Sequence, residues 1–353
     1  MTAARQTGAI DAANTPRLEA WLARELAARA VRVTDAQLLT GGAVQENWRI
    51  TVTVDDGPRA GTHAWVVRAD AAARLPVSLD RASEFAVLAA AFKAGVRVAE
   101  PIARCADTSI IGRPFLVQPL LSGQAQARKL VRDPALAEFG ARLAGECGAE
   151  LARIHAIRVP HAELTALPIP LVAPARAEVA RMRKTLDGSS EPRPALEYIL
   201  GWLDTHAPPA PRALSLVHGD FRTGNYLVDG GRLVGVLDWE FAHWGDGIED
   251  LGWFCARCWR FGNDTLHAGG IAPRAALLAG YNAVCDRRVS EAELTYWEIL
   301  GAARWASIAV LQGDRFRISG DHRLEPALSG LMAPEMELDA LDLIALQADK
   351  GGR

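Results

Sequence analysis

Side chains suited to metal and proton chemistry cluster between His218 and Asp238. Residues 226–237 read as two short strands joined by an Asp-Gly-Gly turn, a pattern that predicts a β-hairpin. Such a hairpin would bring Asp238 back beside Asn225, which precedes its first strand. Two oxygen ligands placed in this way suit Mg²⁺, a hard cation that also keeps waters and binds substrate phosphates. Asp220, in the short loop before Asn225, could then accept a proton from a hydroxyl group that attacks a phosphate.

The spacing of these residues matches a known division of roles. Protein kinases carry a proton acceptor and two metal ligands in the patterns H-R-D-x-x-x-x-N and D-F-G. Residues 218–225 read H-G-D-F-R-T-G-N, and Asp238 follows where the metal-binding aspartate is expected. A purely structural hairpin, with Asp and Asn as turn formers, would account for Asp229 but not for the other three positions. The segment therefore predicts a phosphoryl-transfer site.

The elements that must position this segment fall into two regions. Up to residue 118, residues 36–40 (A-Q-L-L-T) and the alternating apolar residues at 48–54 and 64–67 predict the first three strands of a small antiparallel sheet. Further predictions are a helix from Thr15-Pro16, a helix over 84–94, and short strands at 102–105 and 115–117.

Beyond residues 118–122 the patterns are mostly helical, with a strong helix over 135–157. Residues 159–194 are rich in proline and arginine and predict loops around a short helix, and the chain is again mostly helical from Trp253. The expected fold class is α+β, with an N-lobe over 1–118 and a C-lobe over 119–353.

The segment 218–225, together with V-L-D-W-E at 236–240, resembles the aminoglycoside phosphotransferase and choline kinase superfamily. It is most similar to the branch that also supplies the kinase domain beside some acyl-CoA dehydrogenases. The resemblance extends over residues 30–320 and implies a single bilobal protein-kinase-like domain. It also implies ATP as the phosphate donor, with GTP as the alternative, together with Mg²⁺ and a small-molecule hydroxyl acceptor. Asp220 then corresponds to the catalytic aspartate, and Asn225 and Asp238 to the metal ligands.

The resemblance also implies a nucleotide loop between the first two predicted strands. Residues 39–48 read L-T-G-G-A-V-Q-E-N-W, so Gly41, Gly42 and Asn47 are the candidate nucleotide contacts. The loop lacks G-x-G-x-x-G, and a plain β-turn is the alternative. The linker at 114–121 resembles the adenine-binding hinge.

A cation for the α- and β-phosphates is implied at the end of the third strand. Family members have Lys or Arg there, and this chain has Arg68, with no lysine before Lys93. Arginine stays charged and can bind phosphate through two nitrogens. Glu84, on the following helix, is the predicted acidic partner of Arg68, and an exposed helical glutamate is the alternative.

Two further residues are implied to support the catalytic loop. His218 precedes Asp220 and is expected to hold the loop rather than to transfer a proton. Asp250 lies in W-G-D-G-I-E-D-L-G at 244–252, which matches a family segment, and is expected to bind backbone near the loop.

Cys255 and Cys258 are more typical of a helix core than of a metal site.

Composition narrows the function classes. A net charge of −3 and a pI near 6.3 argue against a nucleic-acid-binding protein. No apolar run is long enough for a membrane span, and five cysteines do not suggest a disulfide framework. A cytoplasmic monomer or homodimer is the expectation.

The acceptor is the least constrained feature of the sequence. Four arginines late in the chain could line an acceptor pocket or form a solvated basic surface: Arg304, Arg315, Arg317 and Arg323. A basic pocket would favour an anionic acceptor such as a hydroxy acid or hydroxyacyl compound, and the alternative acceptor is an aminoglycoside-type antibiotic. A kinase-like regulatory module without turnover is the alternative from another class.

Overall fold

A computed structural model describes residues 10–39, 46–70, 78–189, 191–211, 213–321 and 323–351 of the chain. The chain divides into two compact units. The first comprises residues 1–122 together with Trp239–Phe241, and the second comprises the remainder from residue 123 onward.

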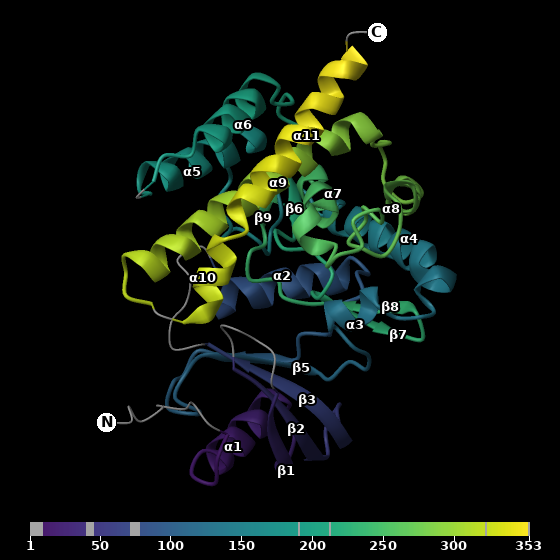
Figure 1. Cartoon of the computed structure of the whole chain (residues 1–353). Helices are drawn as coiled ribbons and strands as arrows, with labels where there is room; N and C mark the ends of the chain where they lie inside the picture. Colours follow the sequence, from purple (N-terminus) through teal and green to yellow (C-terminus); the bar gives the residue numbers. More distant parts are fainter. Residues whose placement is uncertain are drawn as a thin grey trace. The chain divides into compact units, whose positions relative to one another are not determined.

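The first unit is built on an antiparallel sheet with strand order β1-β2-β3-β5-β4 (Figure 1). Its strands are β1 (Ala30–Leu39), β2 (Glu46–Asp55), β3 (Gly61–Ala69), β4 (Ala103–Cys105) and β5 (Phe115–Pro119). Along β2, Ile50, Val52 and Val54 are buried while their neighbours are partly exposed, as expected for a strand with one face on a core. α1 (Thr15–Glu25) adds Trp21 to this core, where it packs edge-on against Phe115 with ring centroids 4.9 Å apart.

Helix α2 (Arg81–Lys93) begins earlier than the sequence predicted. The reason is a side-chain cap: the carboxylate of Asp80 accepts a hydrogen bond of 2.7 Å from the backbone N–H of Ser83. This start places Glu84 in the first turn of the helix.

The second unit is mainly helical. Its helices are α3 (Ala127–Val131), α4 (Leu136–His155), α5 (Pro174–Asp187), α6 (Pro194–Thr205), α7 (Ile248–Cys255), a 3-10 helix at Arg257–Trp259, α8 (Arg274–Asn282), α9 (Glu291–Arg317), α10 (Leu324–Gly330) and α11 (Ala333–Gly351). Its strands form two antiparallel pairs: β6 (Ser215–Val217) with β9 (His243–Gly245), and β7 (Tyr226–Asp229) with β8 (Arg232–Val236).

The long helix α9 contacts most of the other helices of this unit, including α7, α10 and α11 (Figure 1). Its start is fixed by a capping box between Ser290 and Glu293. The backbone of α7 packs directly on α9 at Gly252, where an added Cβ would collide with the main chain of Trp297. This close approach fixes the helix that carries Asp250 and Trp253.

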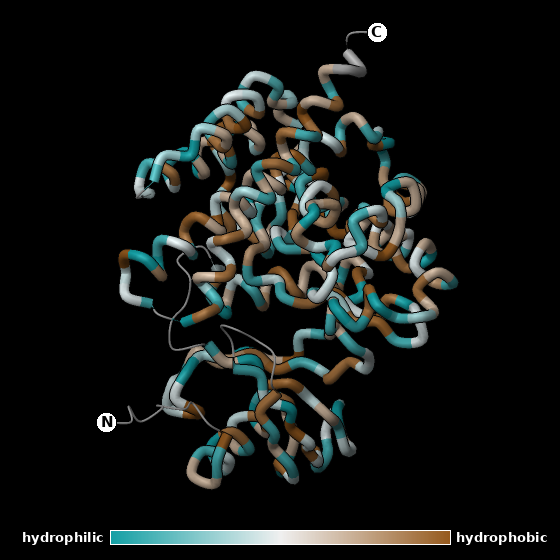
Figure 2. Tube along the Cα trace, in the orientation of Figure 1, coloured by the Kyte–Doolittle hydropathy of each residue, from teal (hydrophilic) through white to brown (hydrophobic). Residues whose placement is uncertain are grey.

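Hydrophobic and hydrophilic residues alternate along most helices and strands of both units (Figure 2), as expected for elements that each bury one face. None of the helices in the described ranges is long and apolar enough to cross a membrane.

Candidate active site

The loop and hairpin predicted from the sequence bring Asn225 and Asp238 to the same end of one structure. In the β7–β8 pair, Tyr226 lies opposite Val236, and the N–H of Leu237 donates a 2.8 Å hydrogen bond to the carbonyl of Asn225. Asp238 follows immediately, in a left-handed backbone conformation with φ of 64°. A non-glycine residue rarely adopts this conformation, so its backbone is held by its surroundings.

The carboxylate of Asp220 is held from three directions. Its Oδ2 accepts hydrogen bonds from Asn225 Nδ2 at 2.7 Å and from Arg222 Nε at 3.2 Å. Its Oδ1 accepts a hydrogen bond of 2.8 Å from Trp253 Nε1. An ionised carboxylate has about four acceptor positions, and the Asp220 carboxylate has no further hydrogen-bond partner among the described residues. Oδ1 therefore keeps one acceptor position for an incoming group.

The orientation of the Asn225 amide suits a metal ligand. Its Nδ2 donates to both the carbonyl and the carboxylate of Asp220, at 2.9 and 2.7 Å, so Oδ1 points away as an acceptor. With Asp238 beside it, the donor set consists of one amide oxygen and one carboxylate, which are the hard oxygen ligands that Mg²⁺ prefers. In the described ranges no group of three or more His, Cys, Asp or Glu side chains is arranged as a metal site. An amide oxygen and a carboxylate suit an ion that takes its remaining ligands from phosphates and water.

Asp250 anchors the start of the loop that carries Asp220. Its carboxylate accepts hydrogen bonds from the backbone N–H groups of His218 at 2.7 Å and Gly219 at 2.9 Å, and from His155 Nε2 at 3.1 Å. Burial by itself raises the pKa of Asp250, but the hydrogen bonds from His155 and from the His218 backbone outweigh it and lower the pKa. Asp250 is therefore an ionised clamp on the loop backbone.

Both ring nitrogens of His218 are engaged with backbone groups. Nε2 donates to the carbonyl of Leu237 at 2.9 Å, and Nδ1 accepts from the N–H of Asp220 at 3.2 Å. His218 thus links the loop to the residue before Asp238. This arrangement fits the supporting role predicted for it.

Arg304 of α9 completes the support of the loop. Its Nη2 donates to the carbonyl of Gly219 at 3.0 Å, and its Nη1 donates to Glu249 at 3.2 Å. Arg304 was predicted to share an acceptor pocket or a basic surface with Arg315, Arg317 and Arg323. In the structure only Arg304 of these four described residues binds the loop that carries Asp220. Those three lie near the end of α9 or beyond it and are paired with acidic side chains: Arg315 and Arg323 with Asp321, and Arg317 with Asp314 and Glu191.

In the first unit, Arg68 and Glu84 form a buried ion pair, with Nη2 and Oε1 3.2 Å apart. Glu84 also contacts Arg81, which in turn binds Asp70 at 2.7 Å. Asn47 lies on β2 directly opposite Arg68 on β3. The Oδ1 atom of Asn47 is buried with no hydrogen-bond partner among the described residues. Gly41 and Gly42, the other predicted nucleotide contacts, lie outside the described residues.

Cys255 and Cys258 lie at the end of α7 and in the following 3-10 helix. Burial raises the pKa of both thiols, which disfavours the thiolate form that a metal needs.

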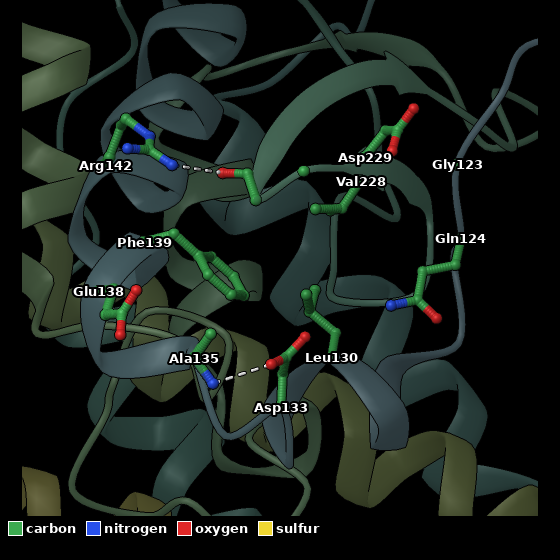
Figure 3. A pocket seen from close by; sticks show the side chains of 12 residues that line it. Gly123, Gln124, Leu130, Asp133, Ala135, Glu138, Phe139, Arg142, Val228 and Asp229 are labelled. Atoms are coloured by element: carbon green, nitrogen blue, oxygen red, sulfur yellow. Dashed lines mark hydrogen bonds between the residues drawn. The ribbon is translucent and has the colours of Figure 1, made fainter.

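The second unit also contains a cavity of about 570 Å³ at the turn of the β7–β8 hairpin (Figure 3). Gly123, Asp133, Arg142 and Asp229 are among the residues that line it. Arg142 donates to the carbonyl of Gly231 there at 3.4 Å. The cavity lies at the opposite end of the hairpin from Asn225 and Asp238.

Sequence reasoning missed Arg222 and Trp253 as neighbours of Asp220. Arg222 lies inside the motif itself, two residues after Asp220. Trp253 lies one helical turn after Asp250, a spacing that places both on the same face of α7. This spacing is the sequence signal from which Trp253 could have been predicted as a neighbour of the loop.

Comparison with known proteins decides the family. The model of the Phosphotransferase enzyme family matches residues 35–292, more than half of the chain. The chain belongs to this family. The protein is therefore a phosphotransferase of the small-molecule type, with a hydroxyl group as acceptor.

Solved structures show the same fold. A Ralstonia eutropha protein assigned to the aminoglycoside phosphotransferases is 23% identical, with a TM-score of 0.75, and the match covers 93% of this chain and 97% of that one. Aminoglycoside phosphotransferase APH(4)-Ia in a ternary complex with ADP and hygromycin B is 14% identical, with a TM-score of 0.56 and coverage of 92% and 98%. These matches establish the bilobal kinase-like α+β fold predicted from the sequence.

Curated relatives match part of the phosphotransferase. Acyl-CoA dehydrogenase family member 11 of Gallus gallus is 31% identical over 178 residues, which is 48% of this chain and 22% of that protein. Acyl-CoA dehydrogenase family member 10 of Mus musculus is 31% identical over 183 residues, 49% of this chain and 16% of that protein. The match thus spans about a fifth of these relatives' length or less.

Proposed function

We propose that the phosphotransferase moves the terminal phosphate of ATP, with Mg²⁺, to a hydroxyl group of an anionic small molecule such as a hydroxy acid or a hydroxyacyl compound. The observation that carries the proposal is the triad at one end of the β7–β8 hairpin. There Asp220 is hydrogen-bonded to Asn225, and Asp238 follows the residue paired with Asn225.

In this proposal Asp220 acts on the acceptor. Its Oδ1 has one free acceptor position, where it would take a hydrogen bond from the hydroxyl and then its proton. The hydroxyl oxygen forms a bond to the γ-phosphorus as the bond from that phosphorus to the bridging oxygen breaks, and ADP leaves. Because this chemistry depends mostly on positioning and charge, the three contacts that fix Asp220 contribute directly to rate.

Asn225 and Asp238 would hold the metal through the Asn225 amide oxygen and the Asp238 carboxylate. Bound there, Mg²⁺ would supply positive charge to the β- and γ-phosphates. Arg68, steadied by Glu84, would neutralise the α- and β-phosphates, with Asn47, Gly41 and Gly42 as nucleotide contacts. Two solved structures of one relative, APH(4)-Ia, hold ADP and AMP-PNP, respectively, which supports a nucleotide donor.

The acceptor proposal is supported by two cations that bind the loop that carries Asp220. Arg222 binds its carboxylate and Arg304 binds the carbonyl of the preceding residue. A polycationic acceptor would meet both guanidinium groups. Aminoglycosides and macrolides are the acceptors named for solved relatives, so they belong in the test as competing acceptors.

The test compares Asp220→Ala with wild type and with Asp229→Ala, which makes the same change at the exposed hairpin turn. Phosphorylated product formed from ATP, Mg²⁺ and a hydroxy-acid panel should fall by about 10²–10⁴-fold in Asp220→Ala. Nucleotide binding, measured by thermal shift, should persist, and Asp229→Ala should behave as wild type. Full transfer activity in Asp220→Ala would overturn the assignment.

A further inference from the structure

Asp220 lies beside a group of aromatic and basic side chains of the second unit. Trp253, whose Nε1 binds Asp220, contacts Trp259 edge-on with ring centroids 5.3 Å apart, and Trp259 contacts Trp305 at 5.1 Å. The guanidinium of Arg222 lies 4.4 Å from the Trp259 ring centroid. The guanidinium of Arg304 lies 4.7 Å from the Trp253 ring centroid. We name these five residues the tryptophan–arginine cluster: Trp253, Trp259, Trp305, Arg222 and Arg304.

The cluster contains a cation with unused donors. Arg222 gives Nε to Asp220 and makes a long 3.5 Å contact from Nη1 to the carbonyl of Thr223. Among the described residues no acceptor lies within hydrogen-bond distance of its Nη2. The side chain is 26% exposed and is held over Trp259 by a cation–π contact, so its orientation is set before a ligand arrives. A pre-positioned guanidinium with free N–H groups suits a carboxylate or a carbonyl oxygen.

The aromatic side of the cluster is apolar and not fully covered. Trp253, Ala256 and Trp259 form a core of their own, against which Cys258, Trp305 and Ile308 pack while only partly buried. The indole nitrogens of Trp259 and Trp305 are buried donors with no partner among the described residues. An unpaired buried donor is unfavourable, so a ligand oxygen that reached either nitrogen after a small side-chain shift would relieve that cost.

These positions relate directly to the reacting atom. The free acceptor position of Asp220 is on Oδ1, the oxygen that Trp253 binds, whereas Arg222 binds Oδ2. An acceptor hydroxyl bound at Oδ1 would therefore have indole rings on one side and a guanidinium nearby.

We infer that the tryptophan–arginine cluster selects the acceptor: Arg222 binds a carboxylate, and the partly buried Trp305, packed on Trp259, binds an apolar chain or ring beside the hydroxyl. This inference rests on the proposed function and makes it more specific, because it requires an acceptor with a carboxylate at one end and an apolar chain at the other. Arg222 and Trp305 are the specificity-determining residues, and Asp220 remains the catalytic one.

The experiment uses matched acceptors, each assayed with ATP and Mg²⁺. The probes are 3-hydroxybutyrate, 3-hydroxyhexanoate and 3-hydroxydecanoate, their methyl esters, which lack the charge, and amino alcohols of the same length, which reverse it. For wild type we expect kcat/KM to be highest for the acids and to rise by up to about fourfold per added methylene. The amino alcohols should be the poorest acceptors.

Two variants separate the parts of the cluster. In Arg222→Gln the ratio of kcat/KM for each acid to kcat/KM for its methyl ester should fall by about tenfold to hundredfold. Arg222→Gln can also disturb Asp220, which Arg222 binds. This disturbance should lower kcat/KM equally for the acid and for its ester, so it cancels in the ratio. In Trp305→Ala the dependence on chain length should flatten, and Trp305→Phe should restore part of it. Arg323→Gln, the same charge change at a residue paired with Asp321, should leave both ratios unchanged.

The outcomes distinguish the inference from the function on which it rests. If wild type phosphorylates none of the hydroxy acids, or prefers a cationic acceptor such as an amino alcohol or an aminoglycoside, the proposed function fails. If wild type transfers phosphate to the hydroxy acids but Arg222→Gln leaves the acid-to-ester ratio unchanged, the inference fails and the proposed function stands.

Discussion

Glu84 in the first unit and Asp250 in the second are both fully buried carboxylates, yet they are satisfied by different partners. Glu84 is bound by the guanidinium groups of Arg68 and Arg81. Asp250 is bound by two backbone N–H groups and by His155. A carboxylate bound to side-chain cations fixes where a charge lies, whereas one bound to backbone fixes the path of the chain. Loss of Asp250 should therefore disturb geometry, and loss of Glu84 should disturb nucleotide affinity.

The largest expected effect is that of Asp250→Asn. The amide replaces an acceptor oxygen with a donor that faces backbone N–H groups, so the loop before Asp220 should shift. We expect kcat to fall by about 10²-fold or more, because a small misplacement of catalytic groups lowers the reaction rate by about this factor. The free energy of unfolding should fall by about 3 kcal/mol.

Steady-state kinetics and urea denaturation measure these two quantities. Asp246→Asn is the matched control, because Asp246 accepts a hydrogen bond from the N–H of Ile248 at the start of α7 and asparagine can accept it equally well. An Asp250→Asn protein with normal kcat would show that the loop does not depend on this clamp.

A smaller and different effect is expected for Glu84→Gln. Arg68 would keep its charge but lose its anionic partner, so its position would be less well defined. KM for ATP should rise about tenfold, corresponding to about 1.4 kcal/mol, while kcat changes less than in Asp250→Asn. Glu19→Gln, at another glutamate of the same unit, serves as the control. An unchanged KM would argue against a nucleotide role for Arg68 and Glu84.

The smallest effect concerns pH. Because the folded-state pKa of Asp250 is lowered below its ordinary value of 3.8, its stabilising contribution is present above that value. It should be lost as the pH falls through the lowered pKa. The difference in free energy of unfolding between wild type and Asp250→Asn should thus be constant near neutral pH and shrink below about pH 4. A difference that grows on acidification would contradict the assigned sign.

The parts of the site that sequence predicted well are local. The hairpin follows from turn residues and strand patterns within one short segment, so the approach of Asn225 and Asp238 could be anticipated. The contacts of Trp253 and Arg304 with the loop arise from packing of α7 on α9, which lie far from it in sequence. No local pattern encodes such contacts.

Dependence on contacts between distant segments also explains where the observed fold differs from the predicted one. The β6–β9 pair joins short strands on either side of the hairpin, and its strands are too short to show a period. Helix α6 lies in a stretch where no helix was predicted, and α5 extends over Pro174–Asp187, where a short helix among loops was expected. Arg222 was visible in the motif, but its stacking on Trp259 depends on tertiary packing.

In the proposed mechanism Asn225 and Asp238 hold the metal while Asp220 faces the acceptor. A crystal structure of the protein with Mg²⁺ and a non-hydrolysable ATP analogue tests it most directly. We expect the ion to be bound by Asn225 Oδ1, the Asp238 carboxylate and phosphate oxygens, with Asp220 Oδ1 outside its ligand sphere. An ion bound elsewhere, or one ligated by Asp220 in place of Asn225, would contradict the account.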